Sequence, residues 1–375
     1  MRIGIYAPYL ETCGGGEKYI CKIAEILSKD NNVEFIVFKS PSIEDLEDKL
    51  RVNLNRISIK KLNVPMPTKK NRYLRRIIKT YMISKISRGY DLFINQEHFS
   101  CIPSLAKKSI LICEVPPTNL NTKLISNVIR KSLFDFGLKT YDMIITNSFY
   151  TKKWIEKYYS QKNIEVLYPP IEQFQFSSKE NIILSVGRFF ANGHCKKQLE
   201  MIRCFKELYN NNDIVKNWRY YLIGGVSSNI EDRKYLKRCQ EEAEGYPIYF
   251  QINISFNTLK VFYGKAKIFW HATGLDEDEN KHPERMEHFG IATGEAMSAG
   301  CVPVVINKGG QPEIVRHKID GFLYNTIGEL KKYTLKLISD ETLLKKMSKR
   351  AIARSKKFNI ERFNKRVMQI FGKLF

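Results

Sequence analysis

Two glutamates stand in a stretch rich in glycine and small residues, EHFGIATGEAMSAGCVPVVINKGGQPEIV, with Glu287 first and Glu295 after seven intervening residues. Gly290 predicts a turn, the residues after it predict a helix, and Gly300 is placed as the residue that ends that helix. Glu287 then lies in the loop before the helix and Glu295 on the helix, about 80° past two full turns. Both acids can therefore face one cleft without being stacked.

The start of this predicted helix suits an anion. Exposed N–H groups near Phe289, Gly290 and Ile291 would act together with the helix dipole. Small residues let a ligand approach the backbone closely. Acids beside an anion site are unexpected unless they bind hydroxyls. A phosphate together with hydroxyls describes a nucleotide sugar.

A second group of charged residues lies in VGRFFANGHCKKQ. Arg188 follows a predicted strand and a glycine, and Lys196 and Lys197 come at the start of the next predicted helix. Arg and Lys at the end of a strand form a good clamp for a diphosphate. Surface cations on a loop are an equally good interpretation of this stretch taken alone.

A third candidate is the glycine run in APYLETCGGGEKY, in which Gly15 and Gly16 could hold a phosphate at a helix N-terminus. The run is not G-x-G-x-x-G, and the next strand ends in Lys39 instead of an acid that would bind ribose. A dinucleotide-dependent dehydrogenase is therefore disfavoured. A bare tight turn remains the alternative.

The elements that would position these residues alternate between strands and helices. RIGIYAP, GGGEKYICKIAEILSKD and NVEFIVFK predict a strand, a helix and a strand, hence a parallel sheet. The pattern restarts after YPPIEQFQFSSKEN. We therefore predict an α/β protein with a first Rossmann-like domain over residues 1–168, a linker over 169–181 and a second such domain over 182–355. Residues 356–375 are predicted to form a helix that packs back on the first domain.

Composition narrows the partners. The 375 residues carry a net charge of +23, which favours polyanionic partners such as nucleic acid, anionic lipid or phosphorylated ligands. No nucleic-acid recognition motif accompanies the charge, so nucleic acid is not expected. Residues 65–90 interleave basic with apolar side chains, as does a helix on an anionic membrane surface. An ordinary domain helix with a basic outer face is the alternative.

Cysteine usage and hydropathy suggest a cytoplasmic protein. Eight scattered cysteines form no C-x-x-C pair, which favours a reducing compartment. We expect no membrane-spanning helix and no signal peptide. Asp276-Glu277-Asp278 imitates a D-x-D metal motif, but it lies in an acidic segment predicted to be a mobile loop, and no metal is expected there.

Taken together, these motifs resemble those of glycosyltransferase family 4, retaining enzymes of the two-domain GT-B type whose domains face a central cleft. Within the family the chain is similar to mannosyltransferases of lipid-linked oligosaccharide synthesis and their bacterial and archaeal relatives. The residues that carry the resemblance are GGGE, TNSFYT, VLYPP, VGRF with the following KK, LIGG, EHFGIATGEAMSAGCVPVV and GGQPEIV. They cover nearly the whole chain in the order found in the family.

The resemblance implies roles for the acids and the backbone. Glu295, the second acid of the family's E-x7-E, would bind ribose hydroxyls, and Glu287 would contact the donor sugar. The amides of Phe289, Gly290 and Ile291 would meet the sugar and the diphosphate.

It also implies roles for the cations and the glycine run. Arg188 and Lys196 would hold the diphosphate as it leaves, with Lys197 the alternative to Lys196. Gly15 and Gly16 would approach the diphosphate or the acceptor. No bound metal is implied.

One departure from the family pattern concerns a histidine. Many members carry a His in a segment that ends in proline, where this chain has CEVPP with Glu114. His98 lies in a neighbouring predicted strand end and could substitute for it, and His271 could lie under the donor site. The sequence leaves these alternatives open.

The sequence thus predicts transfer of a hexose from a nucleotide diphosphate sugar to a glycan or polyprenyl-linked acceptor, with a weak preference for GDP-mannose over a UDP-sugar. The predicted location is cytoplasmic, with a peripheral position on the inner membrane face. A nucleotide-sugar hydrolase or epimerase of the same fold is the alternative. A basic nucleic-acid-binding protein is a weaker one, since it rests on net charge alone.

Overall fold

The structure is a computed structural model that describes residues 1–63, 72–97, 102–117, 132, 134–159, 163–174 and 178–374. The chain divides into two compact units. Unit 1 contains Met1–Tyr168 and Phe363–Phe375, and unit 2 contains Pro169–Arg362. Within the described residues, no helix is long and apolar enough to span a bilayer.

Unit 1 is built on a parallel sheet. Its described strands lie in the order β3-β2-β1-β4-β5-β6-β7, and all neighbours pair in parallel. Their bounds are β1 Arg2–Tyr6, β2 Asn32–Val37, β3 Ile57–Lys61, β4 Leu92–Asn95, β5 Lys108–Cys113, β6 Met143–Thr146 and β7 Ile164–Val166. The central strands are buried along nearly their whole length, as parallel strands covered by helices on both faces must be.

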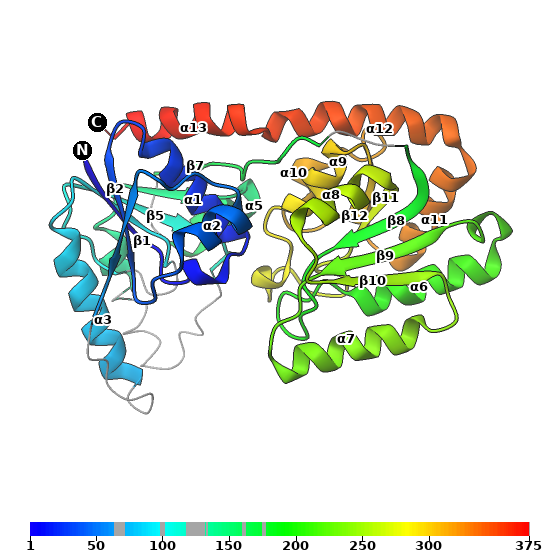
Figure 1. The fold of residues 1–375 in the computed structure, drawn as a ribbon, viewed down its shortest axis with the longest axis horizontal. Helices are drawn as coiled ribbons and strands as arrows, with labels where there is room; N and C mark the ends of the chain where they lie inside the picture. Colours follow the sequence, from blue (N-terminus) through cyan, green and yellow to red (C-terminus); the bar gives the residue numbers. More distant parts are fainter. Residues whose placement is uncertain are drawn as a thin grey trace. The chain divides into compact units, whose positions relative to one another are not determined.

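Helices cover both faces of this sheet. Their bounds are α1 Gly15–Leu27, α2 Ile43–Leu50, α3 Arg72–Ser87, α5 Phe149–Tyr158 and α13 Ile360–Gly372. The apolar side chains of α1 and α13 pack together on one face, where Phe363 lies 5.8 Å from the ring of Tyr19. Figure 1 shows α13 beside α1 and β7. Ile83 of α3 packs on the other face with Tyr6 and Phe93.

Unit 2 repeats the parallel arrangement, with described strands in the order β10-β9-β8-β11-β12-β13. Their bounds are β8 Glu180–Val186, β9 Arg219–Gly224, β10 Ile248–Ile252, β11 Ala266–His271, β12 Val302–Ile306 and β13 Phe322–Tyr324. Counted within the unit, this is the doubly wound order 3-2-1-4-5-6. The order reverses between β8 and β11, as it does between β1 and β4 in unit 1. Ligands of such sheets bind outside the carboxyl ends of the strands at this reversal.

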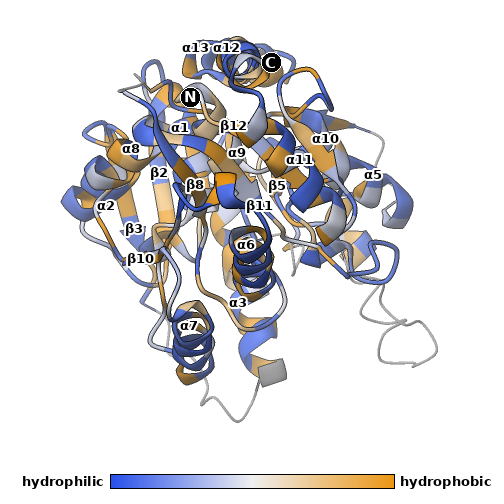
Figure 2. Ribbon diagram, turned by 90° about the vertical axis from the view of Figure 1, so that its right-hand side faces the viewer, coloured by the Kyte–Doolittle hydropathy of each residue, from blue (hydrophilic) through white to orange (hydrophobic). Residues whose placement is uncertain are grey.

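Helices pack around the sheet of unit 2, and α9 is buried all along Thr293–Ser298 and not on one face alone. Their bounds are α6 Gln198–Asn211, α7 Ile230–Ala243, α8 Phe256–Lys265, α9 Ile291–Ser298, α10 Gln311–Ile314, α11 Ile327–Ser339 and α12 Glu341–Ser355. The core between sheet and helices contains Phe205, Tyr220 and Trp270, with the rings of Tyr220 and Trp270 5.2 Å apart. α7 is drawn mostly blue in Figure 2, because hydrophilic residues make up most of it.

Two predicted boundaries differ from this division. The predicted linker, 169–181, falls inside unit 2, and β8 already begins at Glu180. The terminal segment was predicted to leave the second domain at residue 356, but unit 2 extends through Arg362. The reason is local packing: Phe358 accepts a hydrogen bond from Ile171 N at 2.7 Å, and its ring lies 5.6 Å from that of Phe289.

Candidate functional site

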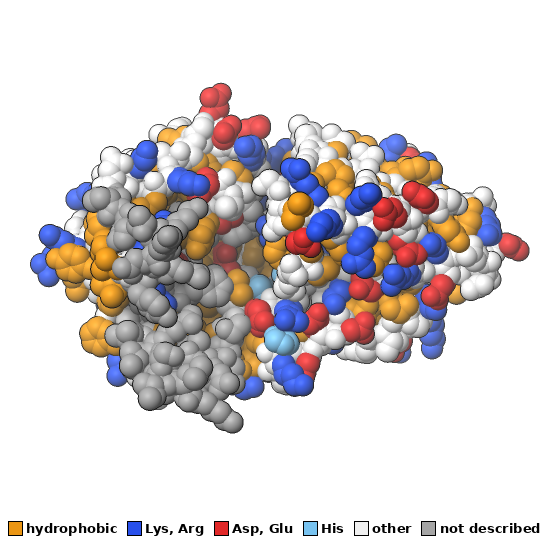
Figure 3. Space-filling view, turned by 90° about the horizontal axis from the view of Figure 1, so that it is seen from below, with side chains coloured by type: hydrophobic (Ala, Val, Ile, Leu, Met, Phe, Trp, Pro, Cys, Tyr) orange, Lys and Arg blue, Asp and Glu red, His pale blue; other side chains and the backbone are white. Residues whose placement is uncertain are grey.

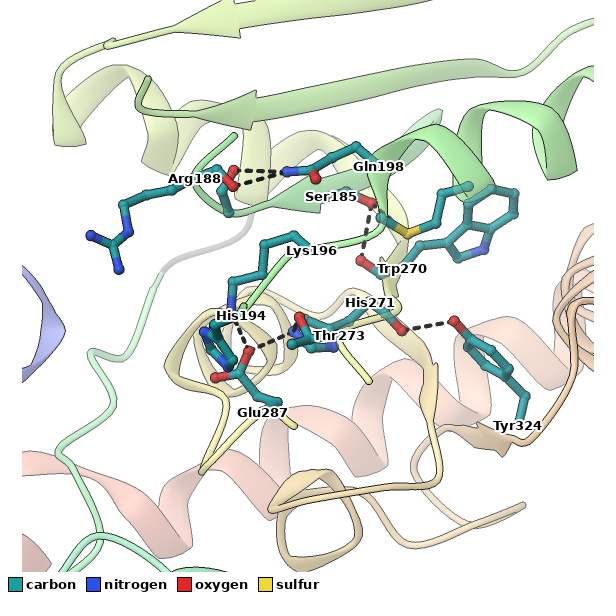
Figure 4. A network of polar contacts seen from close by, with 12 residues as sticks. Ser185, Arg188, His194, Lys196, Gln198, Trp270, His271, Thr273, Glu287 and Tyr324 are labelled. Carbon is teal, nitrogen blue, oxygen red and sulfur yellow. Dashed lines mark hydrogen bonds and ion pairs between the residues drawn. The ribbon is translucent and has the colours of Figure 1, made fainter. Parts of the chain in front are cut away.

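The candidate site of unit 2 lies at the strand reversal and centres on Glu287 (Figure 4). Glu287 Oε2 accepts hydrogen bonds from Lys196 Nζ at 2.6 Å and from His271 Nε2 at 2.7 Å. Lys196 comes from the loop after β8, and His271 is the last residue of β11. The fold therefore brings together three side chains that are up to 91 residues apart in the sequence.

Electrostatics keep the Glu287 carboxylate ionised. Burial alone would raise its pKa, but the charge of Lys196 and the hydrogen bond from His271 outweigh burial and hold the pKa well below its ordinary value. Both partners bind Oε2, and the described residues place no partner on Oε1. Glu287 thus has one oxygen fixed by the protein and one available to accept from a ligand hydroxyl.

His271 is held as a neutral donor. Burial lowers its pKa, and its side chain is 5% exposed. Because Nε2 faces the Glu287 carboxylate, that nitrogen carries the proton and donates. The strand end that carries His271 is fixed by its backbone oxygen, which accepts from Tyr324 Oη at 3.0 Å, and by Trp270 O, which accepts from Ser185 Oγ at 3.0 Å. The geometry of the Glu287 carboxylate is therefore set by the sheet itself.

Two more histidines stand beside this pair. The rings of His194 and His288 stack with centroids 4.9 Å apart, and His194 Nδ1 lies 3.4 Å from Lys196 Nζ. Burial lowers the pKa of His288 to about 4 and that of His194 well below its ordinary value. Both imidazoles are therefore neutral near pH 7. Lys196 and Glu287 are the charged members of this cluster.

Lys197 has a different partner from Lys196. It adopts a left-handed backbone conformation with φ 56° just before α6, and its Nζ donates to Glu277 Oε1 at 2.9 Å. Arg285 Nη1 donates to the other oxygen of Glu277 at 3.0 Å, and Lys308 Nζ donates to the Glu277 backbone oxygen at 2.7 Å. Three cations therefore anchor this acidic loop at Glu277.

Metal ligands are a separate question for this loop. Among the residues that the structure describes, no three His, Cys, Asp or Glu side chains are grouped so that they could hold a metal ion.

The turn before α9 depends on three glycines. Gly290 precedes the helix with φ 114°, a conformation that L side chains rarely adopt. A Cβ at Gly309 or Gly310 would lie 2.2 Å from Glu287 O or 2.4 Å from His288 O. Gly310 N donates to Glu287 O at 2.7 Å across this close contact. The GGQPE segment is therefore a backbone support for Glu287 and for the start of α9.

The second acid lies on the helix, as predicted, and it is buried there with a partner of its own. Glu295 is 6% exposed, and Tyr263 Oη of α8 donates to its Oε2 at 3.2 Å. Lys179 Nζ donates to the backbone oxygen of Tyr263 at 3.2 Å and so fixes the end of α8. The structure assigns Glu287 and Glu295 to separate hydrogen-bond networks of one site.

Arg188 is placed for a ligand rather than for the fold. It is exposed directly after β8, and its guanidinium extends away from Lys196 in Figure 4. No ion pair to its side chain occurs among the described residues, although Gln198 Nε2 donates to its backbone oxygen at 3.1 Å. Arg188 is therefore a cation beside the site that the protein itself leaves uncompensated.

The candidate residues of unit 1 form a second polar group at the carboxyl edge of their sheet. Gly15 and Gly16 are the first residues of α1, so they belong to a helical turn rather than to a loop. Glu114 follows β5 and packs against them: a Cβ on Gly16 would lie 2.3 Å from Glu114 Oε2. Burial, and then the Glu17 charge, raise the pKa of Glu114 to about 8. His98 lies outside the described residues.

Sequence reasoning missed several of these groups. His194 and His288 were not singled out, although both lie inside quoted stretches, VGRFFANGHCKKQ and EHFGIATGEAMSAGCVPVV. Tyr263 gave no signal, because nothing in a helix sequence shows which buried carboxylate a tyrosine will reach. The partnership of His271 with Glu287 was also missed, although His271 had been considered as a residue under the donor site.

Comparison with known structures defines the class of protein. The fold is that of sucrose-phosphate synthase from Thermosynechococcus elongatus (TM-score 0.75, 16% identity, 100% of this chain and 99% of that one). It is also that of Anabaena Alr3699/HepE, solved in complex with UDP and glucose (TM-score 0.74, 15% identity, full coverage of both chains). The protein is a two-domain α/β protein with the GT-B fold.

Sequence comparison finds a family match in unit 2. Residues 170–354 match the family described as "Glycosyl transferases group 1". A GDP-Man:Man(3)GlcNAc(2)-PP-Dol alpha-1,2-mannosyltransferase of Dictyostelium discoideum is 26% identical over 60% of this chain and 46% of its own length. The alpha-1,3/1,6-mannosyltransferase ALG2 of Mus musculus is 24% identical over 67% and 65%. The chain spans roughly half to two thirds of these curated relatives.

The raised pKa of Glu114 yields a prediction about stability. The folded state keeps a proton up to about pH 8, whereas an unfolded glutamate loses it near its ordinary pKa of 4.5. This group therefore contributes most stability at low pH, and the contribution is lost as pH rises toward 8. In the wild type, Glu114 makes the free energy of unfolding fall with pH by at most about 1.4 kcal/mol per pH unit. We expect Glu114→Gln to remove this pH dependence.

The measurement is urea unfolding at several pH values between 5 and 8.5, followed by intrinsic fluorescence. Trp154 is buried in unit 1 and reports on that unit. Glu156→Gln, at a half-exposed acid of α5, is the control and should leave the slope unchanged. Equal slopes in wild type and Glu114→Gln would show that Glu114 is ionised in the folded state.

Proposed function

We propose that this protein is a retaining glycosyltransferase of family 4 that moves a hexose from a nucleotide diphosphate sugar to a glycan or lipid-linked acceptor. The observation that carries the proposal is the Glu287 carboxylate, fixed through one oxygen by Lys196 and His271. It lies at the strand reversal of a GT-B domain, three residues before the N-cap of α9. A sugar hydroxyl and a phosphate are the two groups that such a site would accept together.

Each part of the site would take one part of the donor. The N–H groups of Phe289, Gly290 and Ile291 would bind the diphosphate and the sugar, favoured by the dipole of α9. Glu287 Oε1 would accept from a sugar hydroxyl. Glu295, oriented by Tyr263, would accept from the ribose.

Two cations would stabilise the leaving group. Arg188 is exposed and has no ion pair among the described residues, so a diphosphate would be its partner. Lys196 already binds Glu287 and would share its charge with the phosphate. Lys197, bound to Glu277, would act by holding the loop. In the reaction, the bond from the anomeric carbon to the phosphate oxygen breaks, the acceptor oxygen bonds to the same face, and its proton passes to the diphosphate.

Mannose is favoured as the transferred sugar. Curated relatives include enzymes named for GDP-mannose and for a dolichyl diphosphate acceptor, which supports a mannosyl donor and a lipid-linked acceptor. The HepE complexes contain UDP, so a UDP-sugar is the competing donor. Unit 1 would bind the acceptor. There, Glu114, kept protonated by its surroundings, or His98 would take the place of the family histidine, with Gly15 and Gly16 beside the substrate.

We also propose that α3 rests on an anionic membrane surface, at the cytoplasmic face. Leu74, Ile77 and Tyr81 form an exposed apolar stripe on one face of the helix, with Ile77 65% and Tyr81 66% exposed. Exposed basic residues flank and continue the stripe: Arg75, Arg76, Lys85 and Arg88. Hydrophobic and basic side chains stand together at the left of Figure 3. Such a face combines apolar insertion with attraction to anionic headgroups.

Donor binding is the first test. In a thermal-shift panel of GDP-, UDP- and ADP-sugars, we expect GDP-mannose to raise the melting temperature most, because a ligand that binds the folded state stabilises it. Lys196→Ala and Glu295→Ala should each weaken donor binding or turnover at least tenfold, because each removes a charged partner of the donor. Lys237→Ala on α7, whose side chain is 77% exposed, is the control. Wild-type behaviour of both site variants would contradict the assignment.

Product chemistry is the second test. With GDP-α-mannose and octyl α-mannoside, octyl β-glucoside or octyl N-acetylglucosaminide, we expect an α-linked product, read from its anomeric NMR coupling. We also expect EDTA to leave the rate unchanged, since Arg188 and Lys196 would neutralise the diphosphate. A β-linked product would refute retention. Loss of activity in EDTA with recovery on added Mg²⁺ would refute the metal-free proposal, and free mannose without transfer would indicate a hydrolase.

Membrane binding is the third test. Arg75→Glu with Arg76→Glu should reduce sedimentation with phosphatidylglycerol-containing vesicles by tenfold or more, because each basic residue near such a surface contributes about 1 kcal/mol. Arg233→Glu with Arg238→Glu makes the same charge change at exposed positions of α7 and should have no such effect. Equal losses in both double variants would mean that net charge, rather than α3, governs binding.

A further inference from the structure

Two strand ends of unit 1 carry a polar pair that the fold does not use. Tyr6 ends β1, and Glu97 follows β4, the strand next to β1 at the reversal of the sheet. Tyr6 is fully buried, and Glu97 is 6% exposed. Among the described residues, Tyr6 Oη and Glu97 Oε2 are buried without a hydrogen-bond partner. A buried polar atom left unpaired is costly, so a pair of them at a ligand-binding edge points to a ligand.

The two atoms are complementary to a hydroxyl group. Burial, and then the Glu97 charge, raise the pKa of Tyr6, so its phenol remains an O–H donor near the carboxylate. No hydrogen bond of normal geometry joins the two groups. The pair thus offers one donor and one acceptor at close range. A sugar hydroxyl donates and accepts at once, whereas a phosphate only accepts and would leave Glu97 Oε2 unpaired.

A lysine of α3 orients the acceptor of this pair. Lys79 Nζ donates to Glu97 Oε1 at 2.5 Å, and the Glu97 backbone N–H donates to Asn95 Oδ1 at 2.8 Å. One carboxylate oxygen is therefore fixed and the other is left for a ligand. The Lys79 side chain is 21% exposed, so the cluster reaches the surface of the described unit. Lys79 stands between Ile77 and Tyr81 in the sequence but about 160° around α3 from each, on the face opposite the exposed apolar stripe.

We propose that Tyr6, Glu97 and Lys79 form a subsite for a hydroxyl group of the acceptor sugar, placed at the base of the helix that would meet the membrane. The proposal rests on the proposed function and deepens it: the subsite recognises a neutral sugar hydroxyl, not a phosphate or carboxylate. Its position beside α3 suits an acceptor whose lipid end lies in the bilayer that α3 contacts. Tyr9, 55% exposed and within reach of the Glu97 charge, offers an aromatic face to the same sugar.

The test compares two buried tyrosines of one hydrophobic cluster. Tyr6→Phe removes the unpaired hydroxyl, and Tyr90→Phe, the matched control, removes a buried hydroxyl that donates to Glu34 at the other end of β4. With the octyl glycoside of highest turnover, we expect Tyr6→Phe to raise the acceptor KM about tenfold, as for one lost hydrogen bond. The donor KM and the GDP-mannose thermal shift should stay at wild-type values. Tyr90→Phe should change neither KM.

Monodeoxy forms of the same glycoside give a second readout that a purely structural role would not move. The deoxy glycoside that lacks the hydroxyl contacted by Tyr6 should bind the wild type more weakly than the parent glycoside does. It should bind Tyr6→Phe and the wild type with equal affinity, because the contact with Tyr6 is already missing. Glu97→Gln should raise the KM of the parent glycoside as well. An acceptor KM for Tyr6→Phe within twofold of wild type, or matched by Tyr90→Phe, overturns the subsite. Absence of any transfer by the wild type would instead refute the proposed function itself.

Discussion

A buried carboxylate is stable only when charged or hydrogen-bonding groups compensate it, and the site of unit 2 is built around that constraint. The Glu287 side chain is largely buried, so few water molecules reach it. Hydrogen bonds from Lys196 and His271 to its Oε2 take the place of that hydration. His271 comes from the end of β11 and Lys196 from the end of the loop between β8 and α6, so elements outside its own loop position the carboxylate. Removing Lys196 would leave an uncompensated charge, and removing His271 would remove a hydrogen bond.

The same constraint explains the surroundings of the carboxylate. The Gly309-Gly310 turn packs so closely on the Glu287 loop that no side chain fits there. The neutral His194 and His288 fill space beside Lys196 without adding charge that would compete for Glu287. Glu277 forms an ion pair with Lys197, so the neighbouring Lys196 pairs with Glu287 alone. The two cations of this region differ: Lys196 is bound to Glu287, and Arg188 is exposed directly after β8.

Unit 1 has the same topology and a different chemistry at its strand reversal. There, Glu114 is kept protonated by burial. Glu97 pairs with Lys79 through Oε1, while Glu97 Oε2 and Tyr6 Oη have no hydrogen-bond partner among the described residues. The two doubly wound sheets of one chain thus differ at their strand reversals, with an ion pair around Glu287 in unit 2 and a protonated Glu114 in unit 1.

The sequence by itself determined the elements and the local part of the site. Alternating apolar runs and glycine turns predicted both parallel sheets, the helix that carries Glu295 and the loop that carries Glu287, because these depend on residues close in the chain. Strand β3 and helix α2 were not predicted, since Ile57–Lys61 and Ile43–Leu50 are short and rich in charge.

Only the tertiary structure decided which groups meet. The bond from Lys196 to Glu287 spans 91 residues, and that from Tyr263 to Glu295 spans 32. The proton on Glu114 and the unpaired oxygens of Tyr6 and Glu97 result from burial, which depends on how distant segments pack. Periodicity records the neighbours of a residue along the chain, whereas charge state and hydrogen bonding depend on its neighbours in space.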